Sequence, residues 1–333
     1  MSIVEKTEKA RAILVHEHGG PECMRLEEVD VPPPAPHEVR IRQKAVGLNF
    51  IDIYCRTGLY PNPLPHGLGF EAAGVVESAG TEVRHLRAGD RVAYGQGPIG
   101  AYAELRNVPA DRVVRIPDGV GFEQAAALML KGLTVQYLFR QTYRLQGNET
   151  ILFHAAAGGV GLIACQWARA LGVRLIGTAS TPEKAALARR HGAWEVIDSS
   201  REDIVARVKE LTEGRKVPVV YDGVGRSTWE ISLDCLQPRG LMVSFGNASG
   251  PVEGVNLGVL AAKGSLYVTR PTLATYAATA QAMQAAATEL FDLVAAGKLD
   301  IVIGQRFTLA QAAQAHEALN ARATAGATVL TLD

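Results

Sequence analysis

The feature that most constrains the fold is a run of small residues, Ala-Ala-Ala-Gly-Gly-Val-Gly, at positions 155–161. The pattern at residues 151–154 before it predicts a short buried strand, and residues 159–171 after it carry apolar side chains at helical spacing. Small residues let the backbone turn sharply and approach a pyrophosphate, and the helix start that follows offers free N–H groups and a positive dipole end. The AxxGxxG pattern between a strand and a helix therefore favours a dinucleotide-binding turn over an ordinary glycine-rich loop.

Strand and helix patterns continue to alternate after this turn. Further strands are expected at 175–178, 196–197, 219–221, 241–245 and 265–268, with helices between them that include 182–191 and 204–211. Thr181 is a good N-cap for the first of these helices, with Pro182 at its first position. Such alternation implies right-handed crossovers and a doubly wound parallel sheet with helices on both faces.

The residues on either side of this segment follow other patterns. Up to about residue 130 the chain consists of short β-rich runs at 12–15, 39–46, 72–78 and 91–94, separated by Gly and Pro turns, with a helix at 122–138. Many short strands with such turns predict a barrel or sandwich. The tail predicts a helix over 274–296, a strand over 301–307, a helix over 309–320 and a strand over 327–332. A length of 333 residues fits two domains.

Composition excludes several classes of protein. The 34 basic and 34 acidic residues cancel, so no bulk field draws the chain to nucleic acid or acidic lipid. The four cysteines lie far apart, which argues against a clustered zinc site or a disulfide framework and indicates a reducing, cytoplasmic compartment. The sequence contains no run of 18 apolar residues, so no membrane span is predicted. The N-terminus carries charge without an apolar core, so no signal peptide is expected.

The choice of coenzyme depends on the end of the second strand. An NAD site usually has a carboxylate there that binds the adenosine ribose. In this chain no carboxylate occurs until Glu183, and Lys184 follows it. A missing carboxylate removes the repulsion of a 2′-phosphate, and a lysine can bind that phosphate, so NADP(H) is expected rather than NAD(H).

Four segments resemble the quinone oxidoreductases, the zinc-independent, ζ-crystallin-like branch of the medium-chain dehydrogenase/reductase superfamily. They are HAAAGGVGLIACQWA at 154–168, VGLNFIDIYCRTGLYP at 46–61, KGLTVQYL at 131–138 and GLMVSFGNASG at 240–250. The resemblance covers residues 11–332. It implies an α/β chain with a GroES-like, β-barrel-type catalytic domain at 1–130, completed by 271–333, and a doubly wound Rossmann NADP-binding domain at 131–270. It also implies a homodimer formed through the last strand of the Rossmann sheet.

The resemblance also addresses metal binding. Zinc-dependent relatives need a cysteine at the position of Asn49 and a histidine before the glutamate of a Gly-His-Glu motif. This chain has Gly69-Phe70-Glu71 there, and a phenyl ring cannot bind zinc. No metal is therefore expected. Without a Lewis acid the enzyme suits an acceptor that is already electron-poor, such as a quinone or an alkene conjugated to a carbonyl.

The site residues implied by the resemblance form two groups. The catalytic group, expected beside the nicotinamide, comprises Asn49, Asp52, Tyr54 and Tyr60. The cofactor-binding group comprises Lys131, Thr134, Ala157, Gly158, Gly159, Val160, Gly177, Ser180, Lys184, Ser199, Phe245, Gly246, Asn247, Val268, Arg270 and Arg322. Ser199 stands where close relatives have a tyrosine near the adenine. The alternative for the catalytic group, above all for Asp52, is a polar network that braces a loop.

The resemblance thus implies an NADPH:quinone oxidoreductase with a small-molecule quinone substrate. Two alternatives stay open: an NADPH-dependent enone or 2-alkenal double-bond reductase, and a ζ-crystallin-like RNA-binding or structural protein, against which the neutral charge argues. His66 and His154 have no company of other metal ligands in the sequence and are interpreted as packing residues.

Overall fold

The computed structural model describes residues 6–332, and these fall into two compact units. Unit 1 comprises residues 6–133, 277–295 and 301–332, and unit 2 comprises 134–276 and 296–300. The exact domain borders expected from the sequence, at residues 130/131 and 270/271, remain a prediction. Within the described residues no helix is both long enough and apolar enough to cross a bilayer.

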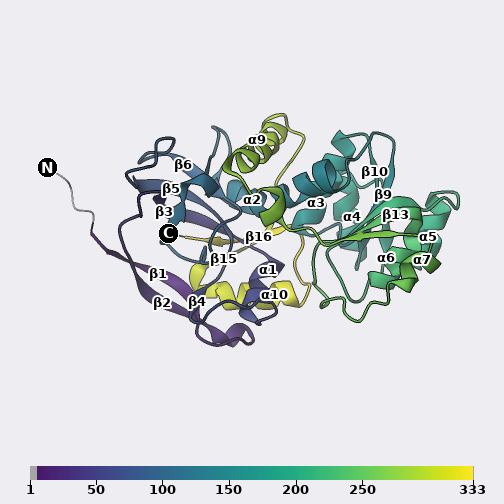
Figure 1. Cartoon of the computed structure of the whole chain (residues 1–333), viewed down its shortest axis with the longest axis horizontal. Helices are drawn as coiled ribbons and strands as arrows, with labels where there is room; N and C mark the ends of the chain where they lie inside the picture. Colours follow the sequence, from purple (N-terminus) through teal and green to yellow (C-terminus); the bar gives the residue numbers. More distant parts are fainter. Residues whose placement is uncertain (1–5, 333) are drawn as a thin grey trace. The chain divides into compact units, whose positions relative to one another are not determined.

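Unit 2 is built on a six-stranded parallel sheet in the order β11-β10-β9-β12-β13-β14 (Figure 1). This is the doubly wound order, which begins in the centre at β9 and reverses direction between β9 and β12. The strands are β9 (Thr150–Phe153), β10 (Arg174–Ala179), β11 (Glu195–Asp198), β12 (Val217–Asp222), β13 (Leu236–Ser244) and β14 (Tyr267–Thr269). The helices are α3 (Gly159–Ala170), α4 (Pro182–Arg190), α5 (Ile204–Leu211), α6 (Trp229–Cys235), α7 (Gly258–Ala262) and α8 (Leu273–Tyr276). The Rossmann prediction is confirmed.

The central strands β9, β10 and β12 of unit 2 are largely buried, as a parallel sheet with helices on both sides requires. Leu152, Ile176 and Val220 come from neighbouring strands and lie in one apolar cluster with side chains of the helices α5 and α6. The cap predicted for α4 is also confirmed, because the Thr181 side chain accepts a hydrogen bond from the Lys184 N–H.

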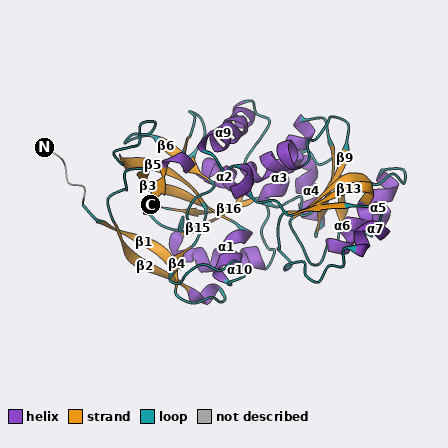
Figure 2. Ribbon diagram, in the orientation of Figure 1, coloured by secondary structure: helices purple, strands orange, loops and turns teal. Residues whose placement is uncertain are grey.

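Unit 1 is mainly antiparallel (Figure 2). Its larger, seven-stranded sheet runs β15-β16-β3-β5-β6-β8, with β7 also paired to β3, and its smaller sheet runs β2-β1-β4. The strands are β1 (Glu8–Val15), β2 (Met24–Val31), β3 (Glu38–Leu48), β4 (His66–Gly67), β5 (Glu71–Ala79), β6 (Arg91–Tyr94), β7 (Leu105–Pro109), β8 (Val114–Arg115), β15 (Ile303–Thr308) and β16 (Ala327–Thr331). The helices are α1 (Phe50–Arg56), α2 (Phe122–Tyr137), whose last residues belong to unit 2, α9 (Ala280–Ala295) and α10 (Ala312–Asn320). The GroES-like prediction is confirmed by the match reported below.

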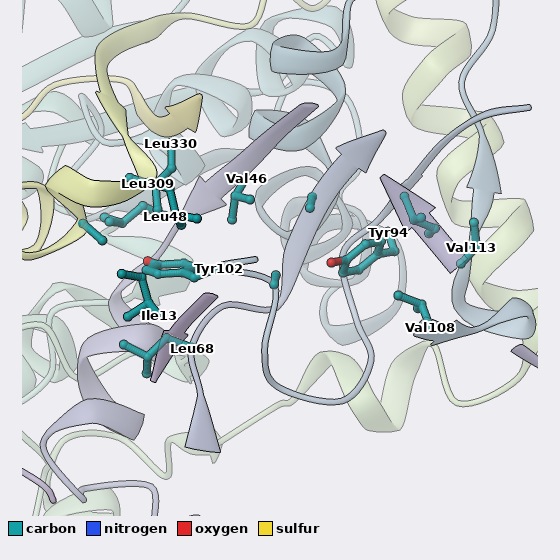
Figure 3. Packing of buried hydrophobic residues seen from close by; sticks show 14 of the residues in the cluster. Ile13, Val46, Leu48, Leu68, Tyr94, Tyr102, Val108, Val113, Leu309 and Leu330 are labelled. Carbon is teal, nitrogen blue, oxygen red and sulfur yellow. The ribbon is translucent and has the colours of Figure 1, made fainter. Parts of the chain in front are cut away.

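The core of unit 1 joins segments that are distant in the sequence. Figure 3 shows the Tyr102 ring among apolar side chains that include Leu48 of β3 and Leu309 from the tail. The tail also contributes β16, which pairs with β3 in a register that sets Thr328 opposite Leu48. The C-terminal residues are therefore an integral part of this unit.

One tail prediction is wrong. The helix expected over 274–296 is interrupted and forms α8 and α9 instead. Arg112 donates hydrogen bonds to the carbonyl oxygens of Ala277 and Ala278, at 3.1 and 3.0 Å, which occupies acceptors that a continuous helix would use. Thr279 then starts the second helix, because its hydroxyl accepts from the Ala282 N–H.

Candidate functional site

The glycine-rich turn between β9 and α3 leaves no room for a larger side chain at its last glycine. A Cβ atom at Gly161 would lie 2.5 Å from the Ala155 oxygen and 2.6 Å from the Ala156 carbonyl carbon. All these atoms belong to the backbone, which cannot move aside cheaply. Ala155 itself has a φ of 54°, in the left-handed region that non-glycine residues rarely adopt. The turn is therefore held in one tight conformation.

The start of α3 fits an anionic ligand. Gly158 is its N-cap and contributes no side chain, the first turn has no acidic residue, and no side chain within residues 6–332 caps this end. The first N–H groups of a helix lack partners within the helix and carry a partial positive charge, which suits a pyrophosphate. The residues present thus fit a dinucleotide coenzyme.

Small residues surround the end of β10, the second strand of unit 2. A Cβ atom at Gly177 would lie 2.5 Å from the Ala156 Cβ, so β10 and the turn approach closely there. Ser180 follows β10, and Lys184 lies in the first turn of α4. Ser199, after β11, donates from its hydroxyl to the Ala179 oxygen at 3.0 Å. These residues lie at the same edge of the sheet as the glycine-rich turn.

The last two strands add further residues to this carboxyl edge. Phe245, Gly246 and Asn247 follow β13, and a Cβ at Gly246 would lie 2.5 Å from the Gly223 oxygen. Arg270 follows β14 and donates to the Ser244 oxygen at 3.0 Å. Ligands of doubly wound sheets bind at this edge. Val268 lies within β14 itself, and Thr134 lies in α2.

In unit 1 the residues of the predicted catalytic group lie within the short helix α1 or close to it in the chain. Asn49 precedes the helix, and its backbone N–H donates to the Asp52 Oδ2 atom at 2.8 Å. The rings of Tyr54 and Tyr60 meet edge to face, with centroids 5.3 Å apart. Tyr54 and Asp52 are both buried within the chain. The structure therefore brings these four residues together.

A second polar cluster of unit 1 is centred on Glu71, whose carboxylate is fully buried. Its Oε1 atom accepts from the Asn49 Nδ2 atom at 2.8 Å and from the ammonium group of Lys131, while its Oε2 atom accepts from the Leu130 N–H at 2.6 Å. Gly47 makes room for this arrangement, since a Cβ there would lie 2.1 Å from Glu71 Oε1. Lys131, predicted as a coenzyme residue, thus shares a carboxylate with Asn49, predicted as a catalytic one.

A third cluster lies behind Asp52. Arg56 Nη1 lies 3.1 Å from His316 Nδ1, His316 Nε2 lies 3.0 Å from the Tyr102 hydroxyl, and that hydroxyl donates to Asp52 Oδ2 at 2.9 Å. Because arginine can only donate, His316 accepts at Nδ1 and donates from Nε2. Burial raises the pKa of Asp52 to about 7, against the lowering effect of its hydrogen bonds from Asn49 and Tyr102.

Comparisons with known proteins now bear on this arrangement. The family model described as "Alcohol dehydrogenase GroES-like domain" matches residues 35–118, and the one described as "Zinc-binding dehydrogenase" matches residues 159–291. A quinone oxidoreductase of Pseudomonas aeruginosa is 63% identical over 322 residues, 96% of this chain and 99% of that relative. The chain belongs to the quinone oxidoreductase family.

Two further members of the wider group are informative. The crystal structure of Escherichia coli quinone oxidoreductase complexed with NADPH superimposes with a TM-score of 0.96 at 55% identity, covering 97% of this chain and all of that one. A 2-haloacrylate reductase from a Burkholderia species is 42% identical over 96% of this chain and 98% of its own length. The resemblance inferred from the four sequence segments is confirmed.

Several buried partners of the site could not be found from the sequence alone. They are Glu71, which the sequence shows only as part of the Gly-Phe-Glu motif, and Arg56, Tyr102 and His316. Glu71 follows Phe70, so the Gly-Phe-Glu motif was a usable signal; no comparable signal pointed to His316, which lies 260 residues from its partner Arg56. Arg322, expected at the 2′-phosphate, follows α10 in unit 1 with a φ of 55°.

The third cluster predicts a pH dependence of stability. Burial, together with the charge of Arg56, lowers the pKa of His316 to about 3, well below its ordinary value. Between pH 6.5 and 3 His316 is therefore protonated in the unfolded chain but not in the folded chain, so stability falls as the pH falls. For the H316Q variant, whose residue 316 does not titrate, this loss disappears. The free energy of unfolding of the wild type minus that of H316Q should therefore fall by about 2–3 kcal/mol between pH 7 and pH 4.5.

Urea unfolding at both pH values measures this difference. Asp52 and His154 are present in both proteins, so their own titrations largely cancel. The same substitution at the exposed His37 is the control and should leave the difference constant. If the free energies of unfolding of the wild type and H316Q differ by the same amount at both pH values, the lowered pKa of His316 is contradicted.

Proposed function

We propose that the chain reduces quinones with NADPH, transferring a hydride without zinc. The observation that carries this proposal is the tight turn at 155–161 before the uncapped start of α3, at the ligand-binding edge of a doubly wound sheet. The Escherichia coli quinone oxidoreductase described above was solved in complex with NADPH. Membership of the family supports a quinone as the acceptor.

The residues of unit 2 are proposed to hold the coenzyme, which supplies the hydride when bound. The N–H groups at the start of α3 would bind the pyrophosphate. Lys184, in the first turn of α4, would bind the 2′-phosphate, and no acidic residue lies between the end of β10 and Glu183 to repel that phosphate. The remaining coenzyme residues at the carboxyl edge are proposed to shape the site.

The residues around α1 are proposed to act on the acceptor. As the hydride arrives, a quinone oxygen becomes negatively charged, and fixed hydrogen-bond donors lower the energy of that charge. Asn49, through its Nδ2 group, and the Tyr54 and Tyr60 hydroxyls are the proposed donors. Water can supply the proton that completes the hydroquinone. Asp52, which is fully buried, is proposed to brace α1 rather than to touch the substrate.

The Glu71 cluster supports hydride transfer without zinc. Asn49 and Phe70 stand where zinc-dependent relatives have ligands, and neither side chain is a zinc ligand of the usual kinds. The nearby carboxylate of Glu71 already accepts three hydrogen bonds, including the one from the Lys131 ammonium group. Among residues 6–332 no group of three or more His, Cys, Asp or Glu side chains is arranged to hold a metal ion. We expect full activity in the presence of a chelator.

The direct test is the loss of NADPH absorbance when purified protein is mixed with NADPH and benzoquinone. We expect oxidation well above the uncatalysed rate, and a higher kcat/KM with NADPH than with NADH. K184A should lose much of that preference, because it removes a charge proposed to bind the 2′-phosphate. Turnover no faster than the uncatalysed reaction would reject the proposal.

Reduction of a conjugated carbon–carbon double bond is the second candidate. It is favoured by the 42% identity to a 2-haloacrylate reductase over nearly the full length of both chains. A panel of quinones, enones, 2-alkenals and 2-haloacrylates separates the two activities by their kcat/KM values. A clear preference for the alkenes would make double-bond reduction the main activity.

A cytoplasmic homodimer is also proposed. β14 is the last strand of its sheet, and its residues Tyr267 and Val268 are 61% and 39% exposed. An edge strand with exposed apolar side chains is suited to pair with a second copy. Light scattering should give about twice 35.5 kDa, and a monomer mass would reject the dimer. The four cysteines are free and buried, which agrees with a reducing compartment.

A further inference from the structure

His154 connects the glycine-rich turn to a buried carboxylate. The imidazole is buried directly before the turn, at the end of β9. Its Nδ1 atom lies 3.1 Å from the Thr178 hydroxyl, and its Nε2 atom lies 3.0 Å from the Ser232 hydroxyl. The sequence alone indicated no more than packing for this residue.

Both ends of this chain of hydrogen bonds have a fixed direction. At one end, the Ala155 N–H can only donate, and it does so to Thr178 Oγ1 at 3.2 Å. At the other end, Ser232 donates to Asp222 Oδ2 at 2.7 Å. The same carboxylate also accepts from the Thr228 hydroxyl and from the N–H groups of Val224 and Gly225. Four donors leave Asp222 as an acceptor throughout.

These fixed ends determine every proton between them. Ser232 has one hydroxyl hydrogen, which it gives to Asp222, so His154 must donate to it from Nε2. Burial lowers the pKa of His154, with Asp222 acting in the opposite direction, so the ring is neutral and Nδ1 is an acceptor. Thr178 therefore donates to Nδ1 and accepts from Ala155. Thr178, His154 and Ser232, the three groups between the fixed ends, each donate once and accept once.

We propose that His154 is a positioning residue for the coenzyme, because this one-directional chain holds Ala155 in its left-handed conformation and so presets the turn that receives the pyrophosphate. The anchored residue is the one with a φ of 54°, and Gly161 packs against its carbonyl oxygen. A turn that relaxes away from this conformation would have to be reordered when NADPH binds, at the cost of affinity. The inference rests on the proposed binding of NADPH.

A matched pair of variants tests the inference. T178V removes the hydroxyl that links Ala155 to His154. T212V makes the same change at another buried threonine of unit 2. The Thr212 hydroxyl likewise accepts from a backbone N–H, that of Lys216 at 2.9 Å, and it donates to the carbonyl oxygen of Val208 at 2.7 Å instead of to a histidine. Both variants should lose similar stability. Only T178V should raise the dissociation constant of NADPH, by about five- to tenfold, as expected for the loss of one net hydrogen bond.

Two further readouts address His154 itself. In ¹⁵N-histidine-labelled protein without coenzyme, the signal that disappears in H154N should report a neutral ring protonated at Nε2. H154N should bind NADPH more tightly than H154L, because the asparagine Oδ1 atom can take the position of Nδ1 and accept from Thr178. A ring protonated at Nδ1, or equal NADPH affinities of T178V and T212V, would overturn the inference. Wild-type protein that does not bind NADPH at all would instead reject the proposed function.

Discussion

The K131M variant should lose about 3–5 kcal/mol of its free energy of unfolding, since it leaves the Glu71 carboxylate buried without its counter-ion. Glu71 is fully buried and Lys131 is 5% exposed, so water cannot replace the lost ammonium group. The Asn49 and Leu130 hydrogen bonds remain, but they do not neutralise the charge. Urea unfolding monitored by circular dichroism measures the loss.

The double variant E71Q/K131M separates the buried charge from other effects of the substitution. The carboxamide that E71Q introduces can accept from the Leu130 N–H with its oxygen, and Asn49 can turn its own carboxamide oxygen towards the new NH₂ group. Stability should therefore recover most of the way to the wild-type value. The control is K9M, which breaks the exposed pair between Lys9 and Glu28 and should change stability by no more than the error of the measurement. Equal losses for K131M and K9M would disprove the account.

G161A should reduce NADPH affinity by more than about tenfold, because it forces the turn open. The new methyl group would meet backbone atoms of Ala155 and Ala156 at 2.5–2.6 Å, so the helix start must move away from the strand end. Binding of NADPH, followed by fluorescence, measures this change, and thermal unfolding should show a lower midpoint.

The comparison for this variant is G147A, also in unit 2. A Cβ atom at Gly147 would have only an ordinary contact of 3.5 Å with the Leu171 oxygen, and its φ is not in the left-handed region. Its NADPH affinity should equal that of the wild type. A G161A protein with unchanged affinity would show that the tightness of the turn is not required for binding.

The features predicted correctly from the sequence are those encoded locally. The turn at 155–161, the alternating strands and helices after it, and the Thr181 cap each depend on neighbouring residues. The helix α1 was not expected, because its seven residues are too few to show a clear period. The break between α8 and α9 depends on Arg112, more than 160 residues earlier in the chain.

The polar clusters could not be predicted for the same reason. Glu71 and Lys131 are 60 residues apart, and Arg56 and His316 are 260 apart, so only the folded chain shows that they meet. The resemblance placed Asn49 and Asp52 in one group, and in the structure the Asn49 N–H donates to Asp52 at the start of α1. Their partners Glu71, Tyr102 and His316 are too far away in the sequence for any spacing rule to predict.

The pairing of β16 with β3 has a consequence for biosynthesis. All six strands of unit 2 lie between residues 150 and 269, so this unit can fold while the ribosome is still adding the tail. Unit 1 must wait for residues 327–331, roughly 60 residues later, which is about 3–12 s at ordinary translation rates. During that interval residues 45–48 of β3, next to Asn49, lack β16, which pairs with them on one side. The nascent chain therefore carries the complete sheet of unit 2 while the sheet of unit 1 still has an open edge. That open edge is where we expect chaperones to bind and aggregation to begin.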